Sequence, residues 1–135
     1  GAVDGVLLLQ PTSPFRTRKR ILDGIELFSQ NKHQSVLGVS PAHSHPMWTL
    51  KKEGEYLVSF MQEHGFGTRS QDLPEALIVN GSFYLISPAE LRMNKSFVAI
   101  KAIPLLIESP QEALDIDTEW DFKMAELIAD CIHDV

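Results

Sequence analysis

Two aspartates separated by one residue, Asp115 and Asp117, are the strongest candidates for chemistry in this sequence. In an extended strand, residues two apart point to the same face, which would put the two Cα atoms about 6.5–7 Å apart. Two carboxylates on one face repel each other unless a cation lies between them. Mg²⁺ commonly binds one or two carboxylates and completes its shell with water and phosphate oxygens. The spacing thus suggests a divalent metal site, but it slightly favours two solvated acids, with Asp117 capping the following helix.

Positive charge is concentrated at the start of a predicted helix, in Arg16, Arg18, Lys19 and Arg20. The helix dipole disfavours cations at this end, where acidic residues are the norm. An anion bound at the helix N-terminus would account for the cluster. A solvated basic turn accounts for it equally well, so both interpretations stay open.

The remaining reactive side chains give weaker signals. His43 and His45 form a His-x-His pair without a third ligand at suitable spacing, so we interpret them as loop residues rather than metal ligands. Cys131 lies on an inner or boundary face of the predicted last helix. It has no basic neighbour to activate its thiol, so we interpret it as structural. The sequence contains no Walker loop, no Gly-x-Gly-x-x-Gly and no Gly-x-Ser-x-Gly motif.

Length and composition limit the class of protein. The 135 residues suit one domain, and the formal net charge of -6 argues against nucleic acid as a partner. No apolar run approaches the roughly 18 residues that a membrane helix needs, and the first residues lack the pattern of a secretory signal. One cysteine cannot form an internal disulfide and fits a reducing compartment, so we expect a cytoplasmic protein.

The hydrophobic pattern then indicates which elements position the acidic pair. Residues 6–9 predict a strand buried on both faces, residues 18–30 a helix with Thr17 as N-cap, and residues 35–40 a second buried strand. The inward face of this helix is predicted to carry Ile21, Leu22, Ile25 and Phe28. Strand, helix and strand in this order form a βαβ unit, which predicts a parallel sheet. A central strand so near the first residue indicates that earlier strands are missing or are supplied elsewhere.

Residues 43–77 interrupt the α/β pattern. Segments 48–50 and 56–60 flank a turn at 51–55 and predict a β-hairpin, and residues 64–74 predict a loop. An isolated hairpin is marginally stable in water, and this one carries much apolar surface. It is therefore expected either to fold back on the body of the protein or to dock on another subunit.

The last part of the sequence again alternates strands and helices. In chain order these are strand material at 77–79 and 83–86 interrupted at 80–81, a short helix after 87–88, strands at 100–107 and 114–117, and a helix at 119–133. Pro104 predicts an edge strand or a bulge. Thr118 and Asp121 resemble a capping box with Asp in place of Glu. The inward residues of the last helix are predicted to be Phe122, Ala125, Ile128, Ala129 and Ile132.

Three segments carry a family resemblance: LLQPTSPFR at 8–16, NGSFY at 80–84 and LDIDTEWDF at 114–122. Together, in this order and at this spacing, they resemble the acylneuraminate cytidylyltransferases (CMP-N-acetylneuraminic acid synthetases). The chain is similar to somewhat more than the C-terminal half of that family. The resemblance implies an α/β fold with a Rossmann-like nucleotide-diphospho-sugar transferase sheet whose N-terminal strands are missing. Residues 1–135 would then be the C-terminal part of one domain, with an inserted dimerisation arm at about 43–77.

The same resemblance implies a reaction. The anomeric hydroxyl of a sialic-acid-like nine-carbon sugar acid attacks the α-phosphorus of CTP and expels pyrophosphate, with Mg²⁺ as cofactor. Asp115 and Asp117 would be the catalytic metal ligands. The residues implied in sugar binding are Gln10, Asn80 and Tyr84, together with Phe97, which would reach the sugar site of a neighbouring subunit in a homodimer. The family segment that grips CTP has no counterpart here, so the chain alone is expected to be inactive.

The sequence departs from the family pattern at the sugar carboxylate. The family commonly has Arg directly before a Gln-x-Leu-Pro stretch, whereas here Ser70 precedes Gln71 and the arginine is Arg69, one place earlier. Either Arg69 reaches in from a shifted backbone beside Gln71, or carboxylate recognition has moved. The sugar acid therefore stays open, with sialic and legionaminic acids as the alternatives.

Two other functions compete with this prediction. The chain would be a non-catalytic dimerisation or sugar-binding fragment if it binds none of the reactants productively. A glycosyltransferase would use the Asp-x-Asp pair with a nucleotide sugar, but this interpretation leaves the segments at 8–16 and 80–84 without an explanation.

Overall fold

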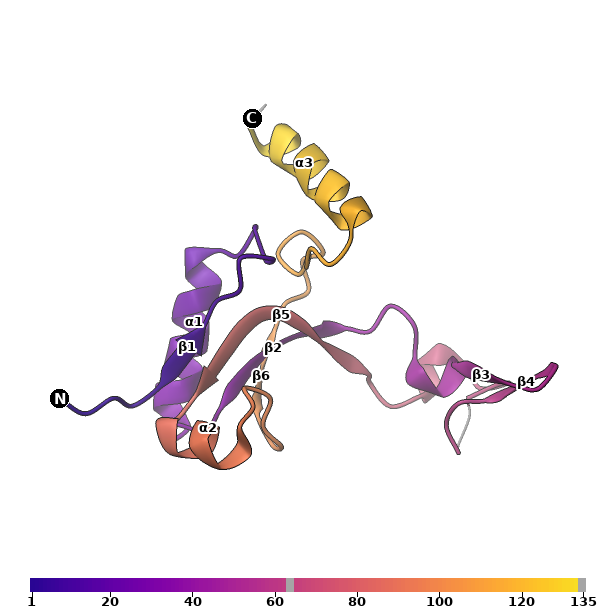
Figure 1. Cartoon of the computed structure of the whole chain (residues 1–135), viewed down its shortest axis with the longest axis horizontal. Helices are drawn as coiled ribbons and strands as arrows, with labels where there is room; N and C mark the ends of the chain where they lie inside the picture. Colours follow the sequence, from indigo (N-terminus) through magenta and orange to yellow (C-terminus); the bar gives the residue numbers. More distant parts are fainter. Residues whose placement is uncertain (63–64, 134–135) are drawn as a thin grey trace. The chain divides into compact units, whose positions relative to one another are not determined.

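The computed structural model describes residues 1–62 and 65–133 (Figure 1). His64, predicted to begin a loop, lies outside the described residues. The chain forms two compact units, one made of Gly1–Ser40 with the described residues from Val79 onward, and the other of Pro41–Ile78. The second unit nearly matches the range 43–77 predicted for an inserted arm.

A four-stranded sheet forms the centre of the first unit (Figure 1). Its strands are β1 (Val6–Leu8), β2 (Val36–Pro41), β5 (Leu77–Ile86) and β6 (Ile103–Leu106), in the order β1-β5-β2-β6. β2 and β6 are parallel, whereas β1 and β5 are antiparallel. The predicted α/β class is confirmed, but the sheet is mixed and the prediction of a parallel sheet is wrong. Strands β1 and β2 are not neighbours, because β5, from much later in the chain, lies between them.

Strand β1 lies at one edge of the sheet. Val6 pairs with Ile86 and Leu8 with Tyr84, and the three residues of β1 are half-buried instead of buried on both faces. Within this chain β1 is therefore not a central strand, because no strand of the described residues pairs with its other side. The further strands expected beside it stay a prediction.

Helix α1 (Arg18–Gln30) begins where the sequence predicts. The Thr17 hydroxyl accepts a hydrogen bond from the backbone N–H of Arg20 at 3.3 Å, as expected of an N-cap. Phe28 is buried and Ile21 half-buried, but Leu22 and Ile25 are 52% and 40% exposed, so half of the predicted inward face is wrong. The helix is rotated from the predicted face because Gly24 lies against the Phe83 ring, which a Cβ at this position would overlap.

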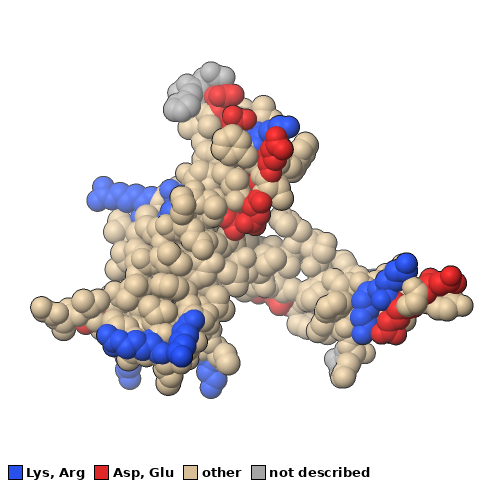
Figure 2. Space-filling model, in the orientation of Figure 1, with Lys and Arg blue, Asp and Glu red and all other residues tan. Residues whose placement is uncertain are grey.

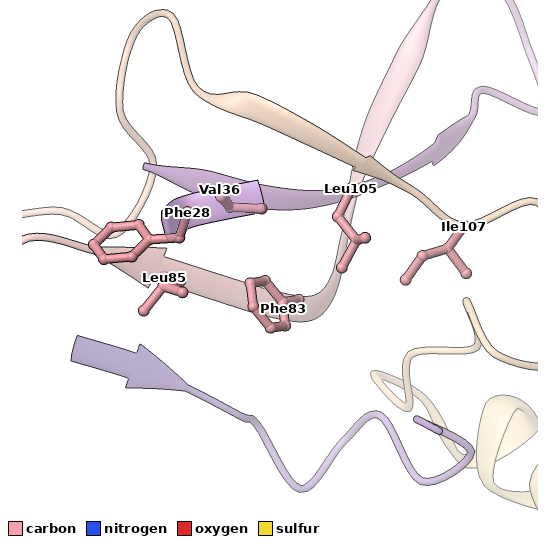
Figure 3. Close-up of a cluster of buried hydrophobic side chains, with 6 residues drawn as sticks. All are labelled: Phe28, Val36, Phe83, Leu85, Leu105 and Ile107. Carbon is pink, nitrogen blue, oxygen red and sulfur yellow. The ribbon is translucent and has the colours of Figure 1, made fainter. Parts of the chain in front are cut away.

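The hydrophobic core joins α1 to three strands (Figure 3). Its buried side chains are Phe28, Val36, Phe83, Leu85, Leu105 and Ile107. Phe83 is only 2% exposed, and it comes from the middle of β5, so the core fixes this strand against α1 and β6. The core therefore holds the strand that carries the NGSFY segment.

Strand β5 is continuous through Asn80 and Gly81, where the sequence predicts an interruption. Gly81 adopts a positive φ of 77° within the strand, so the backbone is deformed there without ending. Helix α2 (Pro88–Asn94) follows as predicted, and its N-cap is Ser87. Strand β6 begins three residues later than predicted, and it is an edge strand as Pro104 indicated.

The segment 114–117 is not a strand, so that prediction is wrong. The Ile116 N–H donates to the Thr12 carbonyl at 2.8 Å, and the Leu114 N–H donates to the Gln111 carbonyl at 3.3 Å. These bonds hold the segment in an irregular conformation, because one partner lies in a loop and the other is three residues back along the chain. The strand geometry assumed for the Asp115–Asp117 pair therefore does not apply.

Helix α3 (Glu119–His133) confirms the predicted capping box. The Asp121 carboxylate accepts a hydrogen bond from the Thr118 N–H at 2.9 Å, and the Thr118 hydroxyl accepts one from the Asp121 N–H at 3.2 Å. The Thr118 hydroxyl and the Asp117 N–H also donate to the same carboxylate. The hydrogen bond from Thr118, followed by the one from Asp117, lowers the pKa of Asp121 below its usual range.

We predict that Thr118→Ala lowers the melting temperature by about 2–6 °C at pH 7, because it removes the cap. A lowered pKa stabilises the folded chain only above the unfolded-state pKa, near 3.8, and this contribution is lost as the pH falls through the folded value. The difference between wild type and variant should therefore shrink when circular dichroism melts are repeated below pH 3.8. Thr68→Ala is the control, because the Thr68 hydroxyl makes no hydrogen bond to a described residue. Equal losses in the two variants would contradict the prediction.

The apolar face of α3 is only partly covered. Ala125 is buried and Ile128 half-buried as predicted, whereas Phe122 and Ile132 are 53% and 45% exposed. Figure 1 shows α3 reaching away from the sheet, and much of the apolar face of this helix is exposed among the described residues. Cys131 is exposed, so the prediction of an inner or boundary position was wrong.

The second unit contains the predicted hairpin. Strands β3 (Leu50–Glu53) and β4 (Tyr56–Ser59) are antiparallel and joined by a turn at 54–55, shorter than predicted. Trp48 lies outside β3, in the short 3-10 helix η1 (Pro46–Trp48), because its indole N–H donates to the Gly65 carbonyl at 3.1 Å. A second 3-10 turn, η2 (Ser70–Asp72), interrupts the predicted loop.

The hairpin exposes both charged and apolar side chains. Figure 2 shows acidic and basic side chains together on this unit, and Lys51 and Glu53 form an ion pair at 3.1 Å. Tyr56 and Leu57 on β4 are 77% and 69% exposed. The apolar surface noted in the sequence is thus real, and its docking on another subunit stays a prediction.

Candidate functional site

The three segments that carry the family resemblance meet in the first unit. The Arg16 Nε donates to the Ser82 carbonyl at 2.6 Å, which joins the loop after β1 to the middle of β5. The Ile116 N–H donates to the Thr12 carbonyl at 2.8 Å, which joins the same loop to the segment before α3. Residues more than sixty positions apart in the sequence are therefore in direct contact at one place.

Arg16 holds the loop that carries Gln10. Besides its bond to Ser82, its guanidinium donates through Nη2 to the Gln10 carbonyl at 2.8 Å. Burial lowers the pKa of Arg16, but an arginine stays protonated at any physiological pH. Arg16 is therefore a fixed cation between the loop and β5.

Gly81 marks the centre of the site. A Cβ at this residue would lie 2.9 Å from the Asp115 Oδ2 and 3.3 Å from the Gln10 Oε1. The Asp115 carboxylate and the Gln10 amide therefore both lie against the backbone of Gly81. Because any side chain at Gly81 would displace them, the glycine permits the close approach.

Asp115 has a buried oxygen without a partner. Its Oδ1 makes no hydrogen bond to any described residue, although buried carboxylate oxygens normally have one. An unpaired buried carboxylate costs free energy unless something compensates it. Oxygen ligands of this kind suit Mg²⁺, so the chemistry of Asp115 and Gln10 fits such an ion.

Asp117 is less well placed than Asp115 for the predicted role of metal ligand. Asp117 is exposed, and its backbone N–H donates to the Asp121 carboxylate at 3.1 Å. In residues 1–62 and 65–133, no group of three His, Cys, Asp or Glu side chains is arranged to hold a metal alone. Mg²⁺ often takes only one or two protein carboxylates together with substrate phosphates, so Asp115 fits the predicted role of metal ligand better than Asp117 does.

Tyr84 and Phe97 form an aromatic pair beside Asp115. Their ring centroids are 6.2 Å apart and their planes are inclined by 72°. Burial, and then the negative charge of Asp115, raise the pKa of Tyr84. The Tyr84 hydroxyl therefore stays protonated at neutral pH and can donate a hydrogen bond. Phe97, expected to reach a neighbouring subunit, lies here against Tyr84 of its own chain.

Asn80 is placed differently from the expected pocket residue. Its side chain is buried, only 7% exposed, and its amide bonds to Ser40 and Ser82. Arg69 and Gln71 belong to the second unit, where both are exposed. The contribution of these three residues to sugar binding stays a prediction.

Two residues of the basic cluster, Lys19 and Arg20, pair with acidic side chains of the same chain. The Glu112 carboxylate accepts hydrogen bonds from the Thr17 hydroxyl at 3.0 Å and from the Arg20 Nε at 3.3 Å, at the N-terminus of α1. Lys19 pairs with Asp23 at 2.8 Å. Glu112 was missed in the sequence, where the one signal was the absence of an acidic residue from the first turn of α1.

The histidine pair lies in a loop, as interpreted. The His45 Nδ1 accepts from the Met47 N–H at 3.2 Å, and its Nε2 lies 2.7 Å from the Pro74 carbonyl. Because Nδ1 accepts, the ring proton lies on Nε2 and is donated to Pro74. His45 therefore fixes the start of η1.

Across the described part of the chain, no helix combines the length and apolar character needed to cross a membrane.

No protein-family model matches the chain. Individual proteins do match it. A CMP-N,N'-diacetyllegionaminic acid synthase of Legionella pneumophila is 33% identical over 126 residues, which are 91% of this chain and 53% of that protein.

Two further relatives cover most of the chain. The post-translational flagellin modification protein B of Campylobacter coli is 29% identical over 93% of this chain and 52% of its own length. An N-acylneuraminate cytidylyltransferase of Streptococcus agalactiae is 29% identical over 86% of this chain and 28% of its own length. The chain thus spans about half the length, or less, of the curated relatives it matches. It is a homologue of part of the larger proteins of the acylneuraminate cytidylyltransferase family.

Proposed function

We propose that this chain forms part of a nucleotidyltransferase that transfers CMP from CTP to a sialic-acid-like nonulosonic acid and releases pyrophosphate. The observation that carries the proposal is the meeting of the three family-like segments at Gly81, where Asp115 presents a buried, unpaired carboxylate oxygen. The names of the relatives support a CMP-sugar as the product.

In the proposed reaction, the anomeric oxygen of the sugar acid forms a bond to the α-phosphorus of CTP. The bond from that phosphorus to the oxygen bridging the α- and β-phosphorus atoms breaks, pyrophosphate leaves with those electrons, and the proton of the anomeric hydroxyl is released to solvent. Mg²⁺, when bound, would neutralise charge on the phosphate oxygens. Asp115 and Asp117 are the residues proposed to hold it, with Asp115 supported by its position in the site. Positioning and charge neutralisation then supply most of the catalysis.

The sugar acid is proposed to bind beside the aromatic pair. The Gln10 amide and the protonated Tyr84 hydroxyl both lie next to Asp115 and offer hydrogen bonds to sugar hydroxyls, while Phe97 offers an apolar face. Arg69 and Gln71 are proposed to bind the sugar carboxylate, which a cation and an amide suit. We also propose a homodimer that uses Pro41–Ile78, and a cytoplasmic location.

The test is a chimera in which this chain replaces the segment that it matches in the Legionella pneumophila relative. The chimera and the chain alone are incubated with CTP, Mg²⁺ and a panel of nine-carbon sugar acids that includes sialic and legionaminic acids. We expect a CMP-sugar and pyrophosphate from the chimera with at least one of them, and no product from the chain alone. A folded chimera that forms neither product with any sugar would refute the activity.

A second candidate is a non-catalytic dimerisation or sugar-binding fragment. It is favoured by the exposed apolar side chains of the hairpin, such as Tyr56 and Leu57. Analytical ultracentrifugation and ligand titration of the chain alone distinguish the two. If the chain forms a stable dimer and the chimera shows no turnover, the two results together would favour this candidate.

A further inference from the structure

Strand β5 is held in its deformed conformation at Gly81 by side-chain bonds from Asn80. The Ser82 N–H donates to the Asn80 Oδ1 at 3.0 Å, and the Ser82 hydroxyl donates to the same oxygen at 2.6 Å. The N–H that follows Gly81 is therefore satisfied by a side chain instead of by a neighbouring strand. All these atoms are buried.

The Asn80 amide is in turn fixed by the neighbouring strand. Its Nδ2 donates to the Ser40 hydroxyl oxygen at 2.8 Å, and the Ser40 hydroxyl donates to the Ile107 carbonyl at 2.7 Å. The chain of bonds thus runs from the end of β2, and from the residue after β6, to the backbone beside Gly81. Linked buried hydrogen bonds of this kind hold one geometry, because each unmet partner would be costly.

Arg16 holds the same backbone through the carbonyl oxygen of Ser82. Its guanidinium donates to the Ser82 carbonyl at 2.6 Å and to the Gln10 carbonyl at 2.8 Å. The N–H and the carbonyl of Ser82 are therefore bonded to different side chains, one from β5 itself and one from the loop after β1. Gly81 lies next to this residue and against Asp115.

We propose that Asn80 and Arg16 are positioning residues, which hold Gly81 and Ser82 so that the Asp115 carboxylate and Gln10 keep their places in the site. The proposal rests on the proposed function, and it changes the role that the family resemblance implies for Asn80. The Asn80 Oδ1 already accepts two hydrogen bonds, as many as an amide oxygen has lone pairs. With its side chain 7% exposed, Asn80 has no free acceptor to offer a sugar.

The test uses the isotope-labelled chain itself, in wild-type form and as Ser40→Ala, Asn80→Ala and Arg16→Ala. Nuclear magnetic resonance measures two quantities, the hydrogen exchange rate of the Ser82 amide and the ¹³C resonance of the Asp115 carboxyl. We expect Ser40→Ala to speed Ser82 exchange about tenfold, because Asn80 loses its anchor. All three variants should shift the Asp115 resonance. Should Asn80→Ala fail to fold, Ser40→Ala and Arg16→Ala still decide the result.

The matched control is Ser35→Ala. Ser35 directly precedes β2 and is buried like Ser40, which lies in β2, but the Ser35 hydroxyl has no hydrogen-bond partner in the described part of the chain. We expect neither quantity to change in this variant. An Asp115 resonance that stays at its wild-type position in Ser40→Ala and Arg16→Ala would overturn the proposal.

Kinetics in an active chimera separate positioning from direct contact. Ser40→Ala and Arg16→Ala should lower kcat and change the KM for the sugar acid less than about twofold, because neither removes a sugar contact. A raised sugar KM in Asn80→Ala alone, with Ser40→Ala equal to wild type, would assign the Asn80 amide to the sugar and overturn the proposal. If the chimera has no activity, the proposed function fails, while the resonance comparison still tests the positioning role.

Discussion

Asp115→Asn is expected to lower the kcat of the chimera by about 10²–10³, the usual loss when one group that stabilises transition-state charge is removed. The substitution keeps the shape of the side chain but removes its charge and half of its oxygen donors. Asp115 Oδ1 is buried and has no hydrogen-bond partner among the described residues, an arrangement that a role in function explains better than a role in folding. Asp117→Asn is also expected to remove most turnover.

The folded state gives this prediction a second readout. Since the buried Asp115 Oδ1 makes no hydrogen bond to a described residue, Asp115→Asn should leave the melting temperature unchanged or raise it. Asp130→Asn, an exposed acidic residue of α3, serves as the control for the loss of one negative charge. Turnover is measured by pyrophosphate release, and folding by circular dichroism. Near-normal turnover in Asp115→Asn would refute the metal-binding role.

Gly81→Ala is expected to destabilise the chain by roughly 2–4 kcal/mol and to reduce turnover as well. Two costs combine at this residue. The positive φ of 77° is unfavourable for any residue with a Cβ, and the new methyl group would lie 2.9 Å from the Asp115 Oδ2. Because the core fixes β5 through Phe83, the strand cannot move away, and the Asp115 carboxylate must shift instead.

Gly54→Ala separates these two costs. Gly54 has a similar positive φ of 60°, but a Cβ there would meet nothing within 4 Å. This control should lose only the conformational part, about 1–2 kcal/mol. Urea unfolding of the two variants gives the difference. If Gly81→Ala is no less stable than Gly54→Ala, Asp115 is not packed against Gly81 as described.

Local signals in the sequence predicted the helices well. Thr17 and the Thr118–Asp121 capping box mark the observed first turns of α1 and α3, because capping depends on residues within one turn. Periodicity was less reliable for the inward faces. Leu22 and Phe122 are exposed, since the surface available for packing depends on elements that the periodicity does not contain.

Pairing between distant segments was the part that the sequence did not predict. The antiparallel insertion of β5 between β1 and β2 depends on long-range contacts, and so does the irregular segment at 114–117. Arg16 was interpreted only as part of a basic cluster, although it bonds to Ser82, 66 positions away. Asp115 was found by its type and spacing, but its relation to Gly81 required the structure.

The proposed function requires the chain to take part in the transfer of CMP to a sugar acid at the Asp115 site. CTP labelled at the α-phosphorus tests it most directly, in the chimera with Mg²⁺ and the preferred sugar acid. We expect the label to appear in a sugar-containing product, the pyrophosphate to be unlabelled, and Asp115→Asn to lower the rate of this transfer by about 10²–10³. Label that stays in CTP, or that appears as free CMP at the same rate without the sugar acid, would contradict it.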